Sequence, residues 1–230
     1  MNIFCFPYAG GSKYMYFELK KKLGNSVKLI PIDYPGHATR ANEALIDSPE
    51  KLADDMFFQM QMHDDGSPFA LLGYSMGSRI AYLIYHKYKN TPLMRRLSCI
   101  ILCAMTFHFD CNDKAPINWN DEDFMNYVIS LGGSDIEDAE DLEAYREFLP
   151  VIRNDLILVS NADKLLRLLP DSVIDKKVYV FYSSDEKHIR DFDAHCSLPV
   201  DYCFFDGGHF FIKSFTDKMA TEIKRIICSK

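Results

Sequence analysis

Three features are scarce in this 230-residue sequence, and each absence excludes a class of protein. The longest apolar stretch, residues 97–107, falls short of the roughly 18–20 residues that a membrane-spanning helix needs. The amino terminus has no basic segment ahead of its apolar run, so no secretory signal is expected. Basic residues are outnumbered 26 to 33, which argues against binding to nucleic acid. We therefore expect a cytoplasmic protein without membrane or nucleic-acid partners, monomeric by default.

Cysteine patterning excludes two further classes of site. The seven cysteines are scattered and odd in number, and no two are spaced as a CxxC pair. They are better interpreted as small buried apolar residues of a reducing compartment than as disulfide partners or metal ligands. No metal or diffusible cofactor is expected.

Alternating strand and helix signals indicate an α/β fold. Strands are expected at 2–7, 27–32, 69–72 and 97–104, and each of the first three is followed by helical periodicity, as in parallel βαβ units. The first of these helices should begin at Ser12, and the next after Ser48, which is followed by proline. The alternation of strands and helices resumes with strands at 177–182 and 201–205 and a helix at 211–227. The pattern predicts one domain, residues 1–230, with a mostly parallel sheet flanked by helices.

The rhythm breaks between the fourth and fifth strands. Residues 110–147 hold 12 acidic and 2 basic residues, and helical patterns recur at 123–131, 140–148 and 156–169. We interpret residues 106–170 as a helical lid inserted in the domain. Its apolar residues are expected to pack over the active site, with Phe124 and Leu149 shaping a pocket.

The sharpest local signal is the pentapeptide from Gly73 to Gly77, with Ser75 at its centre. It lies between an expected strand and an expected helix, the context of a nucleophile elbow. Residues two before and two after such a serine crowd each other, and glycine at both positions relieves the clash. The alternative is a glycine-rich turn with a capping serine.

A serine nucleophile needs a histidine base oriented by a carboxylate, in the chain order Ser, acid, His on this kind of sheet. His209 follows the last expected strand within a glycine-containing loop, so it is the predicted base. Asp185, after the preceding strand, is the predicted acid. Glu186 is chemically able to replace it, and Asp191 and Asp193 are more distant alternatives.

Other residues have expected places around this triad. The amide of Met76, at the helix start, and that of Ala9, in the loop after the first strand, are the expected oxyanion donors, with Tyr8 as the alternative to Ala9. His108 follows a strand end and is expected to line the pocket, as is Tyr8. His37 is expected in a surface or loop position, together with His63 and His86.

With these residues in place, the chain resembles the type II thioesterases, the editing enzymes of nonribosomal peptide and polyketide synthases, which have the α/β-hydrolase fold. The similarity spans nearly the whole chain and rests on four motifs in order, FPYAGG (6–11), YPGHATR (34–40), GYSMG (73–77) and DGGHFF (206–211). Position 74 is Tyr where the family usually has His, and position 78 is Ser where Gly is common.

The resemblance implies that the protein hydrolyses acyl or aminoacyl thioesters on the phosphopantetheine arm of carrier proteins, through an acyl-enzyme on Ser75. Alternatives are a small-molecule esterase or acyltransferase with the same triad, and a non-catalytic relative used for binding. Because the chain outside the acidic lid segment carries a small positive charge, an acidic carrier is expected to dock on the body, near Arg95, Arg96 or Lys187.

Overall fold

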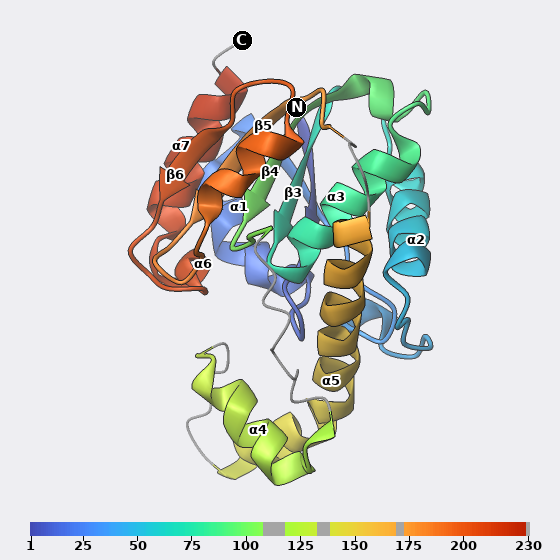
Figure 1. The fold of residues 1–230 in the computed structure, drawn as a ribbon, viewed down its shortest axis with the longest axis vertical. Helices are drawn as coiled ribbons and strands as arrows, with labels where there is room; N and C mark the ends of the chain where they lie inside the picture. The colour runs from blue at the N-terminus through green and yellow to red at the C-terminus, as the bar shows by residue number, and fades with distance from the viewer. Residues whose placement is uncertain (108–117, 133–138, 169–172, 229–230) are drawn as a thin grey trace.

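A sheet of six parallel strands lies at the centre of the protein in a computed structural model, which describes residues 1–107, 118–132, 139–168 and 173–228 (Figure 1). The strand order is β2-β1-β3-β4-β5-β6. All five pairings between neighbours are parallel. The strands are β1 (Asn2–Phe6), β2 (Lys28–Pro31), β3 (Phe69–Tyr74), β4 (Leu97–Cys103), β5 (Lys177–Tyr182) and β6 (Asp201–Phe204). The predicted fold class is confirmed.

Helices cover both faces of the sheet, so the central strands are apolar on both sides. In β1, Ile3 and Cys5 point into one core, which contains side chains of α1 (Phe17–Leu23) and α7 (Thr216–Cys228). Phe4 and Phe6 point into the other, with side chains of α2 (Pro49–Met62) and α3 (Met76–Tyr88). Figure 1 shows α1 and α7 on one side of the sheet and α2 and α3 on the other.

Local signals in the sequence set some of the helix boundaries. Ser48 caps α2 by accepting a hydrogen bond from the Lys51 amide, with Pro49 at the first helical position. Ser12 caps a short 3-10 helix, Lys13–Tyr16, that leads into α1. The helix expected over 211–227 is divided into α6 (Phe211–Ser214) and α7, with a non-helical Phe215 between them.

Between β4 and β5 the described chain forms α4 (Asp121–Ser130) and α5 (Ala139–Leu168). Figure 1 shows α4 and the first part of α5 projecting from the body beyond one edge of the sheet. The two helical segments expected at 140–148 and 156–169 are one 30-residue helix, which continues through Pro150. Its later turns bury Leu158 and Ala162 in the core that contains side chains of α3, and Leu149 and Ile152, on either side of the proline, pack in a second core with α4.

None of the helices in the described ranges is both long enough and apolar enough to span a bilayer. The six cysteines in those ranges are free thiols, and three of them, Cys5, Cys99 and Cys103, are buried. Cys111 lies outside the described residues.

Candidate active site

Ser75 occupies a sharp turn between β3 and α3, with a left-handed φ of 52°. The flanking glycines are required by close approach. A Cβ on Gly73 would lie 2.3 Å from the carbonyl oxygen of Gly77, and a Cβ on Gly77 would lie 2.0 Å from that of Phe6. No larger residue fits either position without moving backbone, so the sequence pattern around Ser75 has a steric cause.

The turn is fixed to the neighbouring strand β4. The Ser75 amide donates to the Cys103 carbonyl at 2.8 Å. The hydroxyl of Ser78, fully buried in the first turn of α3, lies 2.8 Å from both the Gly73 and the Cys103 carbonyl oxygens and accepts from the Cys103 amide at 3.0 Å. These contacts hold the strained backbone in a single conformation, which places the Ser75 side chain at the carboxyl edge of the sheet.

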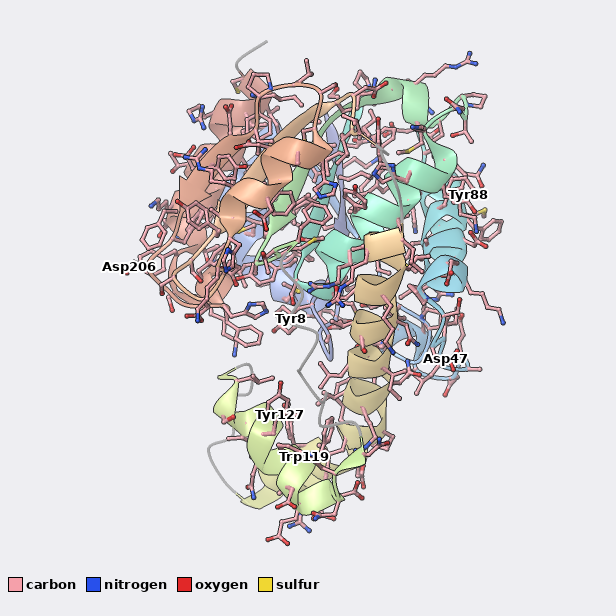
Figure 2. The ribbon with its side chains drawn as sticks, viewed as in Figure 1. Tyr8, Asp47, Tyr88, Trp119, Tyr127 and Asp206 are labelled. Atoms are coloured by element: carbon pink, nitrogen blue, oxygen red, sulfur yellow. The ribbon has the colours of Figure 1, made fainter. Side chains whose placement is uncertain are left out.

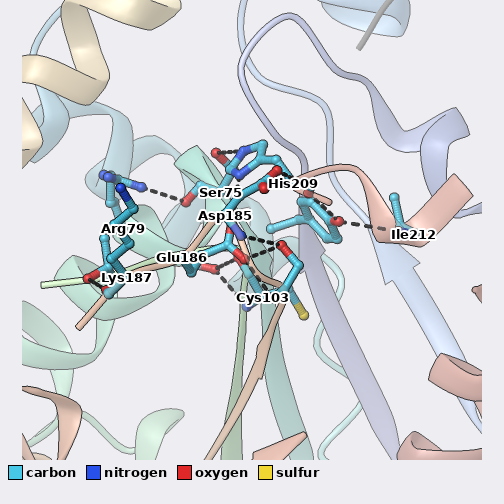
Figure 3. A network of polar contacts seen from close by, with 12 residues as sticks. Ser75, Arg79, Cys103, Asp185, Glu186, Lys187, His209 and Ile212 are labelled. Carbon is cyan, nitrogen blue, oxygen red and sulfur yellow. Dashed lines mark hydrogen bonds and ion pairs between the residues drawn. The ribbon is translucent and has the colours of Figure 1, made fainter. Parts of the chain in front are cut away.

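His209 follows β6 and reaches back to this serine. Its Nε2 lies 3.0 Å from Oγ of Ser75 (Figure 3). The loop that carries it is held by Tyr74, whose hydroxyl donates to the His209 carbonyl at 2.7 Å and accepts from the Ile212 amide at 3.2 Å. The structure therefore brings together Ser75 and His209 in the geometry that proton transfer between them requires.

The carboxylate that meets the histidine ring belongs to Glu186. Its Oε1 lies 2.8 Å from Nδ1 of His209. Asp185, the acid predicted first, instead accepts the main-chain N–H of His209 at 2.7 Å through Oδ2. The expectation that Asp185 faces Nδ1 is therefore wrong, and the alternative, Glu186, occupies that position.

The turn at the end of β5 explains why Glu186, and not Asp185, contacts the histidine ring. Oε2 of Glu186 accepts two hydrogen bonds from Ser183, one from its amide at 2.7 Å and one from its hydroxyl at 2.8 Å. These bonds draw Glu186 inward, where it is 8% exposed, and leave Asp185 on the outside of the turn. Burial acts to raise the pKa of Glu186, but the hydrogen bonds from His209 and Ser183 outweigh it, so the pKa is lowered from its ordinary value. The group is thus a carboxylate at neutral pH.

The expected oxyanion donors lie beside this site. Met76 is the first residue of α3, where N–H groups have no partner within the helix. Ala9 lines the same cavity as Ser75, in the loop that follows β1, and Tyr8 lines it too. Figure 2 shows Tyr8 at the face of the body that is turned toward α4.

A cavity of about 540 Å³ separates Ser75 from the inserted helices. Its walls come from three parts of the chain: the loop after β1, the carboxyl edge of the sheet, and α4 with α5. They are formed by Tyr8, Ala9, Gly10, Ser75, Asp185, His209, Phe210, Tyr127, Val128, Ser130, Leu131, Tyr145, Ile152 and Leu156. The described ranges contain no cluster of His, Cys, Asp and Glu suited to a metal ion.

The two insertion residues that were predicted to shape the pocket do not line it. Phe124 and Leu149 are buried inside a small core between α4 and α5, at 0% and 4% exposure, and neither lines the cavity. Helical periodicity selects the residues that hold two helices together, and it therefore missed Tyr127 and Tyr145, which face the cavity. His108 lies outside the described residues.

Ser75, His209 and Glu186 thus form a chain of contacts from a hydroxyl through an imidazole to a buried carboxylate, which is the arrangement that activates a serine nucleophile. The thioesterase domain family matches residues 1–228. The chain belongs to the thioesterase family. Members of this family are hydrolases that act on thioesters.

Individual relatives of this thioesterase are distant in sequence. The medium-chain S-acyl fatty acid synthase thioesterase of Homo sapiens is 23% identical over 215 residues, which cover 92% of this chain and 80% of that protein. The phenyloxazoline synthase MbtB of Mycobacterium tuberculosis is 26% identical over 229 residues, 96% of this chain, but the match covers only 16% of that much longer protein. Among solved structures, the type II thioesterase BorB from the borrelidin biosynthetic cluster superposes with a TM-score of 0.81 at 22% identity, covering 98% of this chain and 91% of that one.

Two residues that depart from the usual family motif have clear places in this thioesterase. Tyr74 ties the elbow to the histidine loop through its hydroxyl, which reaches both the His209 carbonyl and the Ile212 amide. Ser78 fills the first turn of α3 with a hydroxyl that joins three main-chain groups of β3 and β4. Both side chains therefore make polar links at the elbow, beside the contact between Ser75 and His209.

Proposed function

We propose that this thioesterase hydrolyses acyl or aminoacyl thioesters on the phosphopantetheine arm of a carrier protein, through a covalent acyl-enzyme on Ser75. The observation that carries the proposal is the 3.0 Å contact between Oγ of Ser75 and Nε2 of His209, with Glu186 against the other ring nitrogen. The apolar, aromatic-lined cavity above Ser75 supports an acyl group as the bound part of the substrate.

Acylation uses each member of the triad in turn. Oγ of Ser75 attacks the thioester carbonyl carbon while its proton passes to Nε2 of His209. Glu186 accepts the Nδ1–H bond, which fixes the ring tautomer and stabilises the imidazolium that forms. The carbonyl oxygen becomes an oxyanion, for which the amides of Met76 and Ala9 are the proposed donors. Collapse of the intermediate breaks the C–S bond, and the imidazolium proton goes to the departing thiolate.

Deacylation repeats the sequence with water as the nucleophile. His209 takes a proton from a water molecule, whose oxygen attacks the acyl carbon, and then returns that proton to Oγ of Ser75. The products are a free carboxylic acid and a regenerated enzyme. The carrier leaves with its free thiol, and such a reaction restores a synthase whose arm carries an unwanted acyl group.

Carrier docking must bring the arm to the carboxyl edge of the sheet, where Ser75 lies. Arg95 and Arg96 stand in the 3-10 turn that precedes β4, at the opposite edge, and Arg96 is paired with Asp64. They therefore lie at the edge of the sheet opposite to the one that the arm must reach. Lys187 follows Glu186 at the carboxyl edge and is exposed, so it remains the basic residue proposed to face an acidic carrier.

The deciding experiment measures two reactions with the same preparation. Intact mass spectrometry follows the loss of acyl groups from a loaded carrier protein, and a fluorophosphonate probe reports whether Ser75 becomes labelled. We expect both reactions in the wild type, neither in Ser75→Ala, and strongly reduced rates in His209→Ala.

Three results would count against the proposal. Labelling without carrier deacylation, together with fast turnover of simple esters, would point to a small-molecule esterase. Absence of both reactions would point to a binding protein. Labelling that persists in Ser75→Ala would move the nucleophile to another residue.

A further inference from the structure

A buried carboxylate on the lid helix touches the loop that follows β1. Asp155 lies in α5 and is 2% exposed. Its Oδ2 accepts the main-chain N–H of Gly10 at 2.7 Å, across 145 residues of sequence. Gly10 is adjacent to Ala9, the proposed oxyanion donor, and both line the cavity above Ser75. The helix that roofs the cavity is therefore bonded directly to the backbone beside the proposed oxyanion hole.

The same oxygen of Asp155 lies 2.9 Å from Nε2 of His37, which is 1% exposed. The other ring nitrogen, Nδ1, lies 3.0 Å from the Pro35 carbonyl oxygen. Both neighbours are acceptors, so both nitrogens must donate for the two contacts to hold, and His37 then carries a positive charge. Burial acts to lower the pKa of His37, but the Asp155 carboxylate and the Pro35 carbonyl outweigh it and raise that pKa. His37 thus lies in a loop, as expected, but it is buried and forms an ion pair with Asp155.

The loop has little freedom to settle elsewhere. The Tyr34 hydroxyl donates to the Pro7 carbonyl at 2.8 Å, and the Gly11 amide donates to the Tyr8 carbonyl at 2.8 Å. Gly10 itself has a left-handed φ of 71°, and a Cβ there would lie 3.0 Å from Cγ1 of Ile152, one turn before Asp155 in α5. The Gly10 N–H is thus fixed from the lid side, whereas the Pro7 carbonyl is fixed from the body and the Tyr8 carbonyl is bonded within the loop.

We propose that Asp155 and His37 are positioning residues for the loop that follows β1 and carries the proposed oxyanion donor. Asp155 holds the Gly10 amide, and His37 holds Asp155. Together they place the Ala9 N–H within hydrogen-bonding reach of the reacting carbonyl oxygen. The inference rests on the proposed function, because it assigns the loop that role. It makes α5 part of the catalytic apparatus as well as a wall of the pocket, although neither Asp155 nor His37 lines the cavity.

The test compares variants of Asp155 with the wild type in the full chain. For Asp155→Ala we expect kcat to fall about 100-fold, the loss typical of a displacement of about 1 Å in a catalytic group, with KM little changed. Asp155→Asn keeps the volume and one acceptor for the Gly10 N–H but loses the charge, so a smaller loss of kcat is expected. It also serves as the informative variant if Asp155→Ala fails to fold.

A second readout does not depend on turnover. Amide hydrogen exchange at Gly10, followed by NMR, should be slow in the wild type and several-fold faster in Asp155→Ala. The matched control is Asn154→Ala, which removes a hydrogen bond from the neighbouring residue of α5 to the Ile46 carbonyl at 2.9 Å, away from the loop. We expect the control to keep both the kcat and the Gly10 exchange rate of the wild type.

Specific results would overturn the inference. It fails if Gly10 exchanges equally fast in the wild type and in Asp155→Ala, or if kcat falls equally in Asn154→Ala and Asp155→Ala. If the wild type neither labels at Ser75 nor deacylates a carrier, the proposed function fails instead. The Gly10 exchange rate still decides in that case whether Asp155 holds the loop.

Discussion

Glu186 meets the ring of His209, and Asp185 meets its backbone: Oε1 of Glu186 is 2.8 Å from Nδ1, and Oδ2 of Asp185 is 2.7 Å from the main-chain nitrogen. Two adjacent carboxylates thus act on different parts of one residue. The first can set the charge and tautomer of the imidazole, whereas the second can only orient the loop. Substituting each carboxylate in turn therefore separates the effect on the imidazole from the effect on the loop.

Replacement of Glu186 by Gln should lower kcat by about 10³–10⁴-fold, because the imidazolium formed during attack loses its carboxylate and the ring loses its fixed tautomer. Asp185→Asn keeps an acceptor for the His209 N–H, so we expect less than about a tenfold loss. Steady-state rates on an acyl carrier protein check both values. A larger loss in Asp185→Asn than in Glu186→Gln would contradict the assignment of Glu186 to the triad.

The lowered pKa of Glu186 predicts a definite dependence of stability on pH. The folded state favours the carboxylate, so its contribution is fully present above the unfolded pKa of about 4.3 and is lost as pH falls through the lower folded pKa. Denaturant unfolding of the wild type and Glu186→Gln across this acidic range should show the difference in unfolding free energy becoming smaller as the pH falls. A constant difference would mean that the Glu186 pKa is not lowered by folding.

The cavity walls predict where acyl-chain preference is set. Leu131 lines the cavity at the end of α4, whereas Ile129, two residues earlier and also exposed, is not among the described residues that line it. Leu131→Trp should shift hydrolysis toward shorter acyl groups by filling part of the volume, and Ile129→Trp should leave the preference unchanged. Competition among carriers loaded with different chain lengths measures this. Equal shifts in both variants would show that the cavity does not hold the acyl group.

The sequence predicted a structural feature correctly where a local residue pattern has a steric or periodic cause. The glycines at 73 and 77 are required because a Cβ at either position would lie 2.0–2.3 Å from a backbone carbonyl oxygen, so the pattern identified the turn at Ser75 directly. All six expected strands are present, and the inner ones were found because strands buried on both faces read as short apolar runs, whereas the edge strands β2 and β6 are only partly buried. His209 could be singled out because it follows the last of them.

Sequence could not resolve features that depend on the rotation of one residue or on distant partners. Asp185 and Glu186 are neighbours of similar chemistry, and only the hydrogen bonds from Ser183 decide which one turns inward. His37 and Asp155 are 118 residues apart, and nothing local to either one indicates the other. Phe124 and Leu149 have the periodicity of core residues, and their core lies within the insertion instead of over Ser75.

The helix α5 belongs to two cores at once. Leu149 and Ile152 pack with α4 in the insertion, while Leu158, Ala162 and Leu166 pack with the body of the molecule. A helix of 30 residues is about 45 Å long. Pro150 lacks the N–H that would bond to the carbonyl of Arg146, so the helical hydrogen-bond ladder is interrupted at that point. The break in this ladder lies between the first turns of α5, which pack with α4, and the turn that carries Asp155 against the Gly10 loop.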